Sequence, residues 1–230
     1  MASACDRARR SPDLVKLVVV TKSVDVFTIR QLLDLGVTDI GESQVQELVR
    51  RAAMIQETLQ RMPLASDAAP PDAPNWHMVG HLQRNKVKTL VPWVHVIHSL
   101  DTLRLAEDLS AAGEKRDQRI DALLQVNAGE EPQKFGVAVA AAPHVVEQFC
   151  TLPGLRLRGL MGMAPLTDDR DRLRRVFVRL REVFDEIRGA RLSGPAFDQL
   201  SMGMTQDFEI AIEEGATIVR VGTALFEGIV

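Results

Sequence analysis

The feature that most constrains the fold of this 230-residue chain is a regular alternation of strand-like and helix-like segments. A β-branched run at Leu14–Val20 precedes a segment, Val26–Leu33, in which apolar residues recur every three or four positions, and this pair of patterns repeats to the C-terminus. The strand-like segments are Leu14–Val20, Val37–Ile40, Trp76–Val79, Val94–Ile97, Ile120–Val126, Leu155–Met161, Phe197–Leu200 and Thr217–Val221. The pattern therefore predicts eight strand-helix units.

Short strands that are apolar on both faces are typical of a parallel sheet covered by helices. Eight units in 230 residues fit a closed (β/α)₈ TIM barrel better than an open doubly wound sheet. We predict an α/β fold with one domain over residues 1–230. Residues 1–13 are expected to be a surface lead-in, and the proline-rich residues 63–74 a long surface loop rather than a domain linker.

Charge and composition exclude several classes of protein. The formal charge is 28 − 31 = −3, which lacks the cationic excess of a general nucleic-acid binder. No apolar run approaches the ~18 to 20 residues of a membrane span. Cys5 and Cys150 form no CxxC pair, which is typical of a reducing compartment. We expect a cytoplasmic protein that binds neither nucleic acid nor membrane.

The histidines do not predict a metal centre. His77 and His81 are four residues apart, but Gly80 and the strand-like pattern around it argue against one helix that presents both. His95 and His98 are an odd number of residues apart, so on one strand they point to opposite faces. We therefore expect no metal site.

Lys22 is the first candidate functional residue. It directly follows an apolar strand, at the strand end where barrels of this kind carry their active sites. Partial burial there would favour the neutral amine, which can form a Schiff base with a carbonyl compound. Its position is equally consistent with a solvated lysine just past the end of a strand.

A phosphate site is the second candidate, because barrels often bind phosphate in the loops after their seventh and eighth strands. Ser201 and Gly203 lie in the first of these loops, and Gly222 and Thr223 in the second. The hydroxyls can bind an anion, and the glycines let backbone N–H groups come close to it. Ordinary capping of the following helices is the alternative explanation.

Arg220 lies two residues before Gly222, so both positions share one face of the strand. That face would point toward the phosphate site. If the ligand were pyridoxal phosphate (PLP), the guanidinium could donate to the pyridine nitrogen, which would then stay unprotonated and make the ring a weaker electron sink. The alternative is a salt bridge to Glu42 or Asp207.

Several longer motifs resemble a known family. They are DIGESQVQEL, WHMVGHLQRNKVK, GLRLRGLMGMAP and LSMGMTQDFEIAIEEGATIVRVGTALF. Together they are similar to the pyridoxal phosphate homeostasis protein family, whose fold is like the N-terminal barrel of alanine racemase. The resemblance extends from about Leu14 to Phe226, with the motifs in the same order.

The resemblance implies PLP as the cofactor, held as an internal aldimine on Lys22. It assigns phosphate binding to Ser201, Gly222 and Thr223, and it places Arg220 against the pyridine nitrogen. The remaining positions that it implies near the cofactor are Met161, Ser43, Met202 and Gly203. The chain departs from the family pattern at Ser43, where asparagine is usual, and in a shorter segment before the first strand.

The resemblance implies a PLP carrier or buffer without efficient catalysis, with PLP-dependent apo-enzymes as recipients and a monomer or homodimer as its state. An amino-acid racemase is the main alternative. Racemisation needs a second acid-base group on the opposite face of the ring, which alanine racemase takes from a tyrosine of an additional domain, whereas this chain ends at Val230 and contains no tyrosine. A class I aldolase, which also uses a barrel lysine but has no absorbing cofactor, is the third hypothesis.

Overall fold

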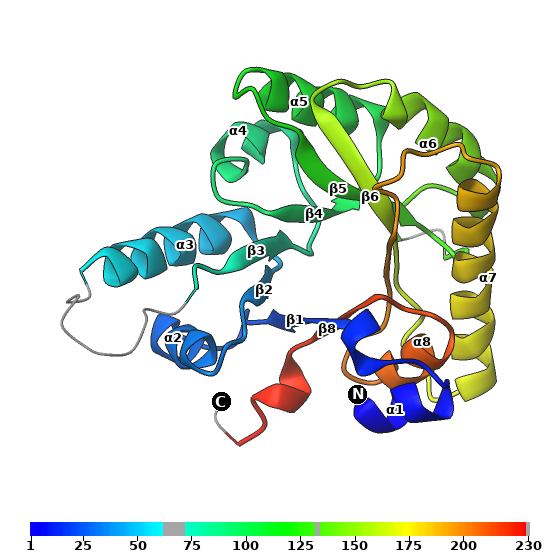
Figure 1. The fold of residues 1–230 in the computed structure, drawn as a ribbon, viewed down its shortest axis with the longest axis horizontal. Coiled ribbons are helices and arrows are strands. Elements are labelled where there is room, and N and C mark those ends of the chain that lie inside the picture. The colour runs from blue at the N-terminus through cyan, green and yellow to red at the C-terminus, as the bar shows by residue number, and fades with distance from the viewer. Residues whose placement is uncertain (62–71, 132–133, 229–230) are drawn as a thin grey trace.

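The computed structural model describes residues 1–61, 72–131 and 134–228. In it, eight parallel strands close into a barrel in chain order, which confirms the predicted fold class (Figure 1). The strands are β1 (Lys16–Val20), β2 (Asp39–Glu42), β3 (Asn75–Met78), β4 (Val96–Leu100), β5 (Ile120–Val126), β6 (Leu155–Gly162), β7 (Gln199–Ser201) and β8 (Ile218–Val221). Because the strands are parallel, all their C-terminal ends lie at one end of the barrel.

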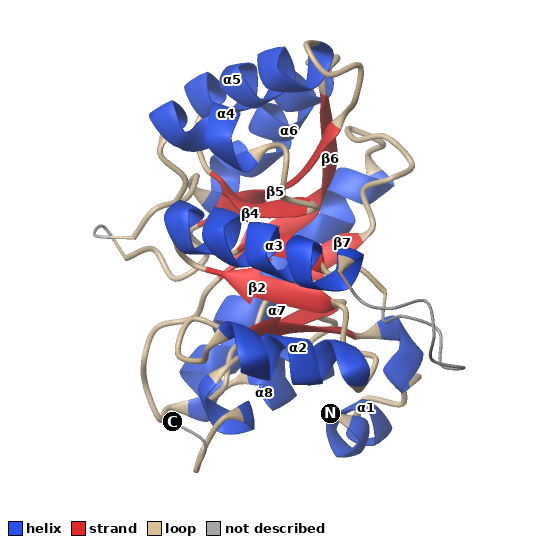
Figure 2. Cartoon of the chain, turned by 90° about the vertical axis from the view of Figure 1, so that its left-hand side faces the viewer, coloured by secondary structure: helices blue, strands red, loops and turns tan. Residues whose placement is uncertain are grey.

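Helices connect the strands and cover the outside of the barrel, as Figure 2 shows from the side. They are α1 (Ala2–Arg7), α2 (Val26–Asp34), α3 (Val45–Gln60), α4 (Val87–Leu90), α5 (Leu103–Glu114), α6 (Ala142–Cys150), α7 (Arg170–Gly189) and α8 (Phe208–Glu213). Each long helix turns a stripe of buried apolar residues toward the strands, as the spacing of those residues predicts. A short 3₁₀ helix, Thr223–Leu225, follows β8.

The N-terminal segment corrects one expectation. Residues 1–13 are not only a surface lead-in, because α1 lies against α8 and buries Ala4 and Cys5 (Figure 1). Arg7 forms ion pairs with Glu209 and Glu213 on α8. Of the predicted loop at 63–74, residues 63–71 lie outside the described part of the chain, and residues 72–74 form neither helix nor strand.

Alternation along the strands creates two apolar layers. Val19 faces the large core between strands and helices, whereas Val18 belongs to a small cluster inside the barrel. The other buried members of that inner cluster are Val96, Leu123, Met161 and Ile218. Side chains fill the barrel, so a ligand has to bind at one of its ends. Within the described ranges, no helix is long and apolar enough to cross a membrane.

Candidate functional site

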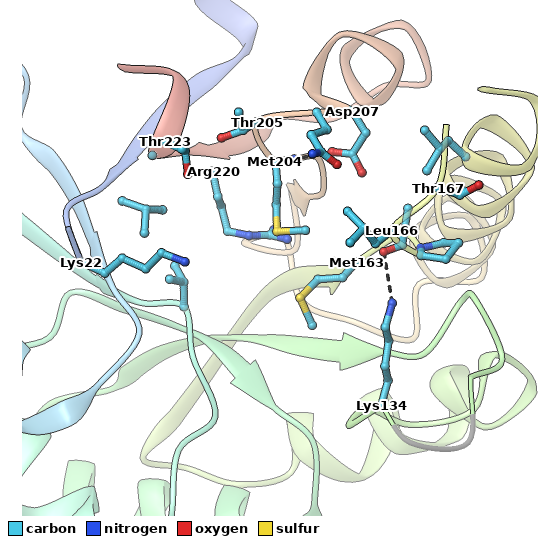
Figure 3. A pocket seen from close by; sticks show the side chains of 17 residues that line it. Lys22, Lys134, Met163, Leu166, Thr167, Met204, Thr205, Asp207, Arg220 and Thr223 are labelled. Atoms are coloured by element: carbon cyan, nitrogen blue, oxygen red, sulfur yellow. Dashed lines mark hydrogen bonds between the residues drawn. The ribbon is translucent and has the colours of Figure 1, made fainter. Parts of the chain in front are cut away.

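A cavity of about 540 Å³ opens at the C-terminal ends of the strands (Figure 3). This volume lies within the usual range of pockets for small molecules. The cavity brings together four of the residues predicted from the sequence: Lys22, Arg220, Gly222 and Thr223. The other charged side chains in its wall are Lys134 and Asp207. The predicted Schiff-base lysine, ring-facing arginine and phosphate loop therefore share one cavity.

The pairing of β1 with β8 explains why Lys22 and Gly222 meet. Val19 is in register with Val221, so the chain leaves both strands at the same level. A Cβ atom at Gly222 would lie 2.8 Å from the carbonyl oxygen of Val20, closer than side-chain atoms tolerate. Glycine therefore allows the loop that carries Thr223 to lie directly against the end of β1.

Lys22 extends into the cavity from the end of β1 and is exposed, so the expected partial burial of its amine is wrong (Figure 3). Lys134 enters from another side. Its amine is bonded to the carbonyl oxygen of Ala164, at 3.2 Å, and forms an ion pair with Glu131. No partner of the Lys22 amine is found in the described part of the chain. Lys22 is therefore the amine in this cavity that is available to a ligand.

A buried ion pair holds the backbone beside Lys22. Arg51 on α3 donates through one nitrogen, Nη1, to Glu42 Oε1 and to the carbonyl oxygen of Thr21, each at 2.5 Å. The Thr21 hydroxyl donates to the same Glu42 oxygen at 2.6 Å. Both charged side chains are buried. The sequence predicts neither contact, because Glu42 and Arg51 are nine residues apart on different elements.

Arg220 is buried inside the barrel below the cavity mouth. Its Nη1 donates to Ser201 Oγ at 2.5 Å and its Nη2 to the carbonyl oxygen of Gly162 at 3.0 Å. Burial lowers the pKa of Arg220 to about 10, against the opposing effect of the negative charge of Asp207. The guanidinium is thus charged at neutral pH. The alternative ion pairs are not formed in the described structure, since Glu42 binds Arg51 and Asp207 accepts from the Met204 N–H.

The remaining predicted positions do not line this cavity. Met161 lies in the inner cluster, and Met163 reaches the cavity wall instead. Met202 is buried in the outer core, and Ser43 is half-buried at the end of β2. Ser201 is fully buried, with its hydroxyl turned to Arg220. Their roles toward a ligand stay predictions.

Gly203 does not line the cavity, but its conformation places the neighbouring residues of the β7 loop in the cavity wall. Its φ of +92° is in the left-handed region, and a Cβ atom there would lie 2.5 Å from Ala211 Cβ. Its carbonyl oxygen accepts from the Arg220 N–H at 3.0 Å. Glycine at this position therefore lets the β7 loop pack against both α8 and β8, which places Met204 and Thr205 in the wall.

A row of buried polar side chains crosses the barrel interior beneath the cavity, and we call it the interior relay. His77 Nε2 lies 2.9 Å from Asp39 Oδ1, and His77 Nδ1 lies 2.9 Å from His98 Nε2. His98 Nδ1 lies 3.0 Å from Ser201 Oγ, which in turn contacts Arg220. The sequence does not predict this relay. In the described residues, no group of three or more His, Cys, Asp or Glu side chains is placed to hold a metal ion.

The relay predicts acid-sensitive stability. Burial lowers the pKa of His77 and, more strongly, that of His98, where the charges of Arg220 and Lys16 act in the same direction. Asp39 opposes the shift at His77, while Lys16 and the neighbouring His95 add to it. In the unfolded chain both histidines take up protons near pH 6.5, whereas in the folded state they stay neutral to lower pH. Stability is thus fully present above about pH 6.5 and is lost as the pH falls.

We expect the free energy of unfolding to fall below pH 6.5 by up to ~1.4 kcal/mol per pH unit for each of the two histidines. Urea denaturation at several pH values between about 5 and 8 measures this slope. The exposed His144, replaced by glutamine, is the control and should leave the slope unchanged. A free energy of unfolding that does not vary over this range would contradict the prediction.

Comparisons with known proteins find similar sequences over nearly the whole chain. A family model described as the N-terminal domain of alanine racemase matches residues 5–229. The pyridoxal phosphate homeostasis protein of Aquifex aeolicus is 39% identical over 223 residues, which cover 97% of this chain and 91% of that protein. The corresponding protein of Pseudomonas aeruginosa is 35% identical and covers 97% of this chain and 88% of that protein.

Solved structures are similar over the whole barrel. PipY of Synechococcus elongatus, in its structure with PLP bound, has a TM-score of 0.80 and 31% identity, with 97% of each chain covered. Alanine racemase of Clostridium difficile has a TM-score of 0.72 at 10% identity, with 98% of this chain and 55% of that chain covered. The second likeness is one of fold alone.

Proposed function

Because this chain belongs to the pyridoxal phosphate homeostasis protein family, within the alanine racemase N-terminal domain fold, we propose that it binds PLP in the cavity and holds it without efficient catalysis. It would act as a carrier or buffer of the intracellular cofactor, with PLP-dependent apo-enzymes as the recipients. One observation carries the proposal: the Lys22 amine, which has no partner among the described residues, enters a cavity that also presents Arg220 and Thr223.

The donor set fits the chemistry of PLP. Lys22 supplies an amine that can form a Schiff base with the aldehyde of PLP. The permanent positive charge of Arg220 suits an unprotonated pyridine nitrogen. Thr223 supplies a hydroxyl for the phosphate, and Gly222 leaves the adjacent backbone open to it. When bound, PLP supplies an electron sink, but an arginine partner keeps that sink weak. This weakness suits a protein that holds the cofactor rather than one that uses it.

An absorption spectrum tests the proposal. Purified protein incubated with PLP and then freed of unbound PLP by gel filtration should show a band between about 300 and 500 nm. Borohydride should then fix the cofactor to the protein, and peptide mapping should find the label on Lys22. Absence of a protein-bound band after unbound PLP has been removed would refute cofactor binding and would favour an aldolase. Racemisation of alanine by the loaded protein at rates typical of enzymes, with k_cat above about 1 s⁻¹, would refute the carrier role instead.

Replacement of Thr223 by valine should weaken PLP binding about 10- to 100-fold, because a hydrogen bond to a charged phosphate contributes ~1.5–3 kcal/mol. Thr223 is exposed, so the substitution costs little packing. Titration with pyridoxal, which lacks the phosphate, is the discriminating measurement and should give the same affinity for both proteins. Thr223→Ser keeps the hydroxyl and should bind PLP as the unmodified protein does. Equal weakening for PLP and pyridoxal would remove Thr223 from the phosphate site.

A further inference from the structure

We propose that Asp39, His77 and His98 are positioning residues that act through Ser201 to fix the direction of the Arg220 guanidinium. This inference rests on the proposed function, because Arg220 matters to the ligand only if PLP binds in the cavity above it. Its structural basis is the interior relay, which runs from Asp39 at the start of β2, through β3, β4 and β7, to Arg220 on β8.

The two ends of the relay, together with neutral imidazoles between them, determine the direction of every hydrogen bond in it. A guanidinium can only donate and an ionised carboxylate can only accept. Bonds to His77 and Lys16 outweigh the effect of burial and lower the pKa of Asp39 to about 2, so the carboxylate is ionised at neutral pH. His77 must therefore donate to Asp39 through Nε2–H, and its Nδ1 is left as an acceptor.

The remaining bonds follow in the same way. His98 donates through Nε2–H to His77 Nδ1, and its own Nδ1 accepts from the Ser201 hydroxyl. Ser201 Oγ in turn accepts from Arg220 Nη1. Both imidazoles are neutral in this arrangement, which agrees with the direction in which burial shifts their pKa values. With both imidazoles neutral, no other assignment satisfies all four bonds.

The relay limits what Ser201 and Arg220 can do. The single hydroxyl proton of Ser201 is committed to His98, so Ser201 cannot donate it to a ligand while the relay is intact. Ser201 is also the side-chain hydrogen-bond partner of Arg220 in the described structure, where the second bond goes to the carbonyl oxygen of Gly162. The orientation of the guanidinium therefore depends on a carboxylate at the opposite end of the barrel, beside Lys16.

Nitrogen NMR of the unloaded protein tests the relay without any ligand. In ¹⁵N-labelled protein, we expect His77 and His98 to be neutral Nε2–H tautomers at neutral pH and to take up protons only below the ordinary pH range of histidine, because burial lowers the pKa of both rings. The exposed His144, recorded in the same spectra, serves as the reference for a histidine that faces solvent. An Nδ1–H tautomer, or ordinary titration of either buried ring, would overturn the assigned directions.

Substitution at the far end of the relay tests its effect on the ligand site. Asp39→Ala leaves His77 Nε2–H without its acceptor, and we expect it to shift the absorption maximum of bound PLP and to weaken binding at least about threefold. Lys16→Ala removes only the surface partner of Asp39 and is the matched control, with no change expected. His144→Gln is the second control.

The outcomes separate the two proposals. If the unmodified protein binds no PLP, the proposed function fails, while the NMR result still decides whether the relay exists. If the unmodified protein binds PLP and Asp39→Ala leaves both spectrum and affinity unchanged, the positioning role is refuted. Where Asp39→Ala does not fold, Asp39→Asn replaces it. Asparagine keeps an acceptor for His77 but loses the charge, so we expect a spectral shift smaller than that of alanine in a folded protein.

Discussion

Replacement of Lys22 by alanine is expected to abolish the borohydride-fixable absorption band of bound PLP. The reason is chemical: without the amine, no bond to the aldehyde carbon can form, whereas noncovalent contacts to Arg220 and Thr223 remain. The fold should be unaffected, because Lys22 is exposed and contributes little packing. The spectrum between about 300 and 500 nm, before and after reduction, measures the effect, and circular dichroism checks the fold.

Lys134→Ala is the matched comparison for this experiment. Lys134 enters the same cavity, but its amine is already bonded to Ala164 and paired with Glu131. We therefore expect the Lys134 variant to keep the reducible band, with the label on the Lys22 peptide. A label that borohydride still fixes covalently to the Lys22 variant, or one that maps to Lys134 in the unmodified protein, would show that the covalent lysine is assigned wrongly.

Replacement of Arg51 by alanine should lower the free energy of unfolding by ~3–5 kcal/mol, because it leaves Glu42 as a buried carboxylate without its cation. The Thr21 carbonyl oxygen also loses its charged donor and keeps only the Val24 N–H, so the backbone beside Lys22 is held less firmly. Urea denaturation measures the stability, and PLP titration of the folded variant should show weaker binding.

Arg50→Ala is the neighbouring control on the same helix. Arg50 is exposed and pairs with Glu47, an interaction of a type that contributes only ~0.3–0.5 kcal/mol. A loss of stability at Arg51 no greater than that at Arg50 would contradict the claim that the Glu42–Arg51 pair supports the site. Equal PLP affinity of the Arg51 variant and the unmodified protein would show that this pair stabilises the barrel without positioning Lys22.

The barrel could be predicted because its signal is local. Each strand and each helix shows its period within about ten residues, and β5 was located to the residue at Ile120–Val126. The end of the barrel that holds the cavity follows from strand direction alone. Lys22, Arg220, Gly222 and Thr223 were found because each directly follows, or lies in, a predicted strand.

The interior relay could not be predicted, because its contacts join residues as far apart as His98 and Ser201, 103 positions along the chain. Which polar side chains meet inside a barrel depends on the register of several strands, which no local pattern encodes. The pair Glu42–Arg51 was missed for a related reason, since a lone arginine on an amphipathic helix is usually a solvated residue. The sequence did not predict that α1 packs against the barrel, because its buried residues, Ala4 and Cys5, are small.

The pairing of β1 with β8 closes the barrel, so the cavity is complete only when the last strand has been synthesised and has docked. Lys22 lies near the beginning of the chain, and Gly222 and Thr223 lie about two hundred residues later, yet they share one cavity. A chain still emerging from the ribosome holds the amine but lacks the loop that we propose for the phosphate, so under the proposed function the cofactor binds only after the last strand docks. Any ligand that contacts both the β1 end and the β8 end favours the barrel in which β8 is docked over the one in which it is not. Such a ligand stabilises the folded protein, so the supply of cofactor affects how long the protein stays folded.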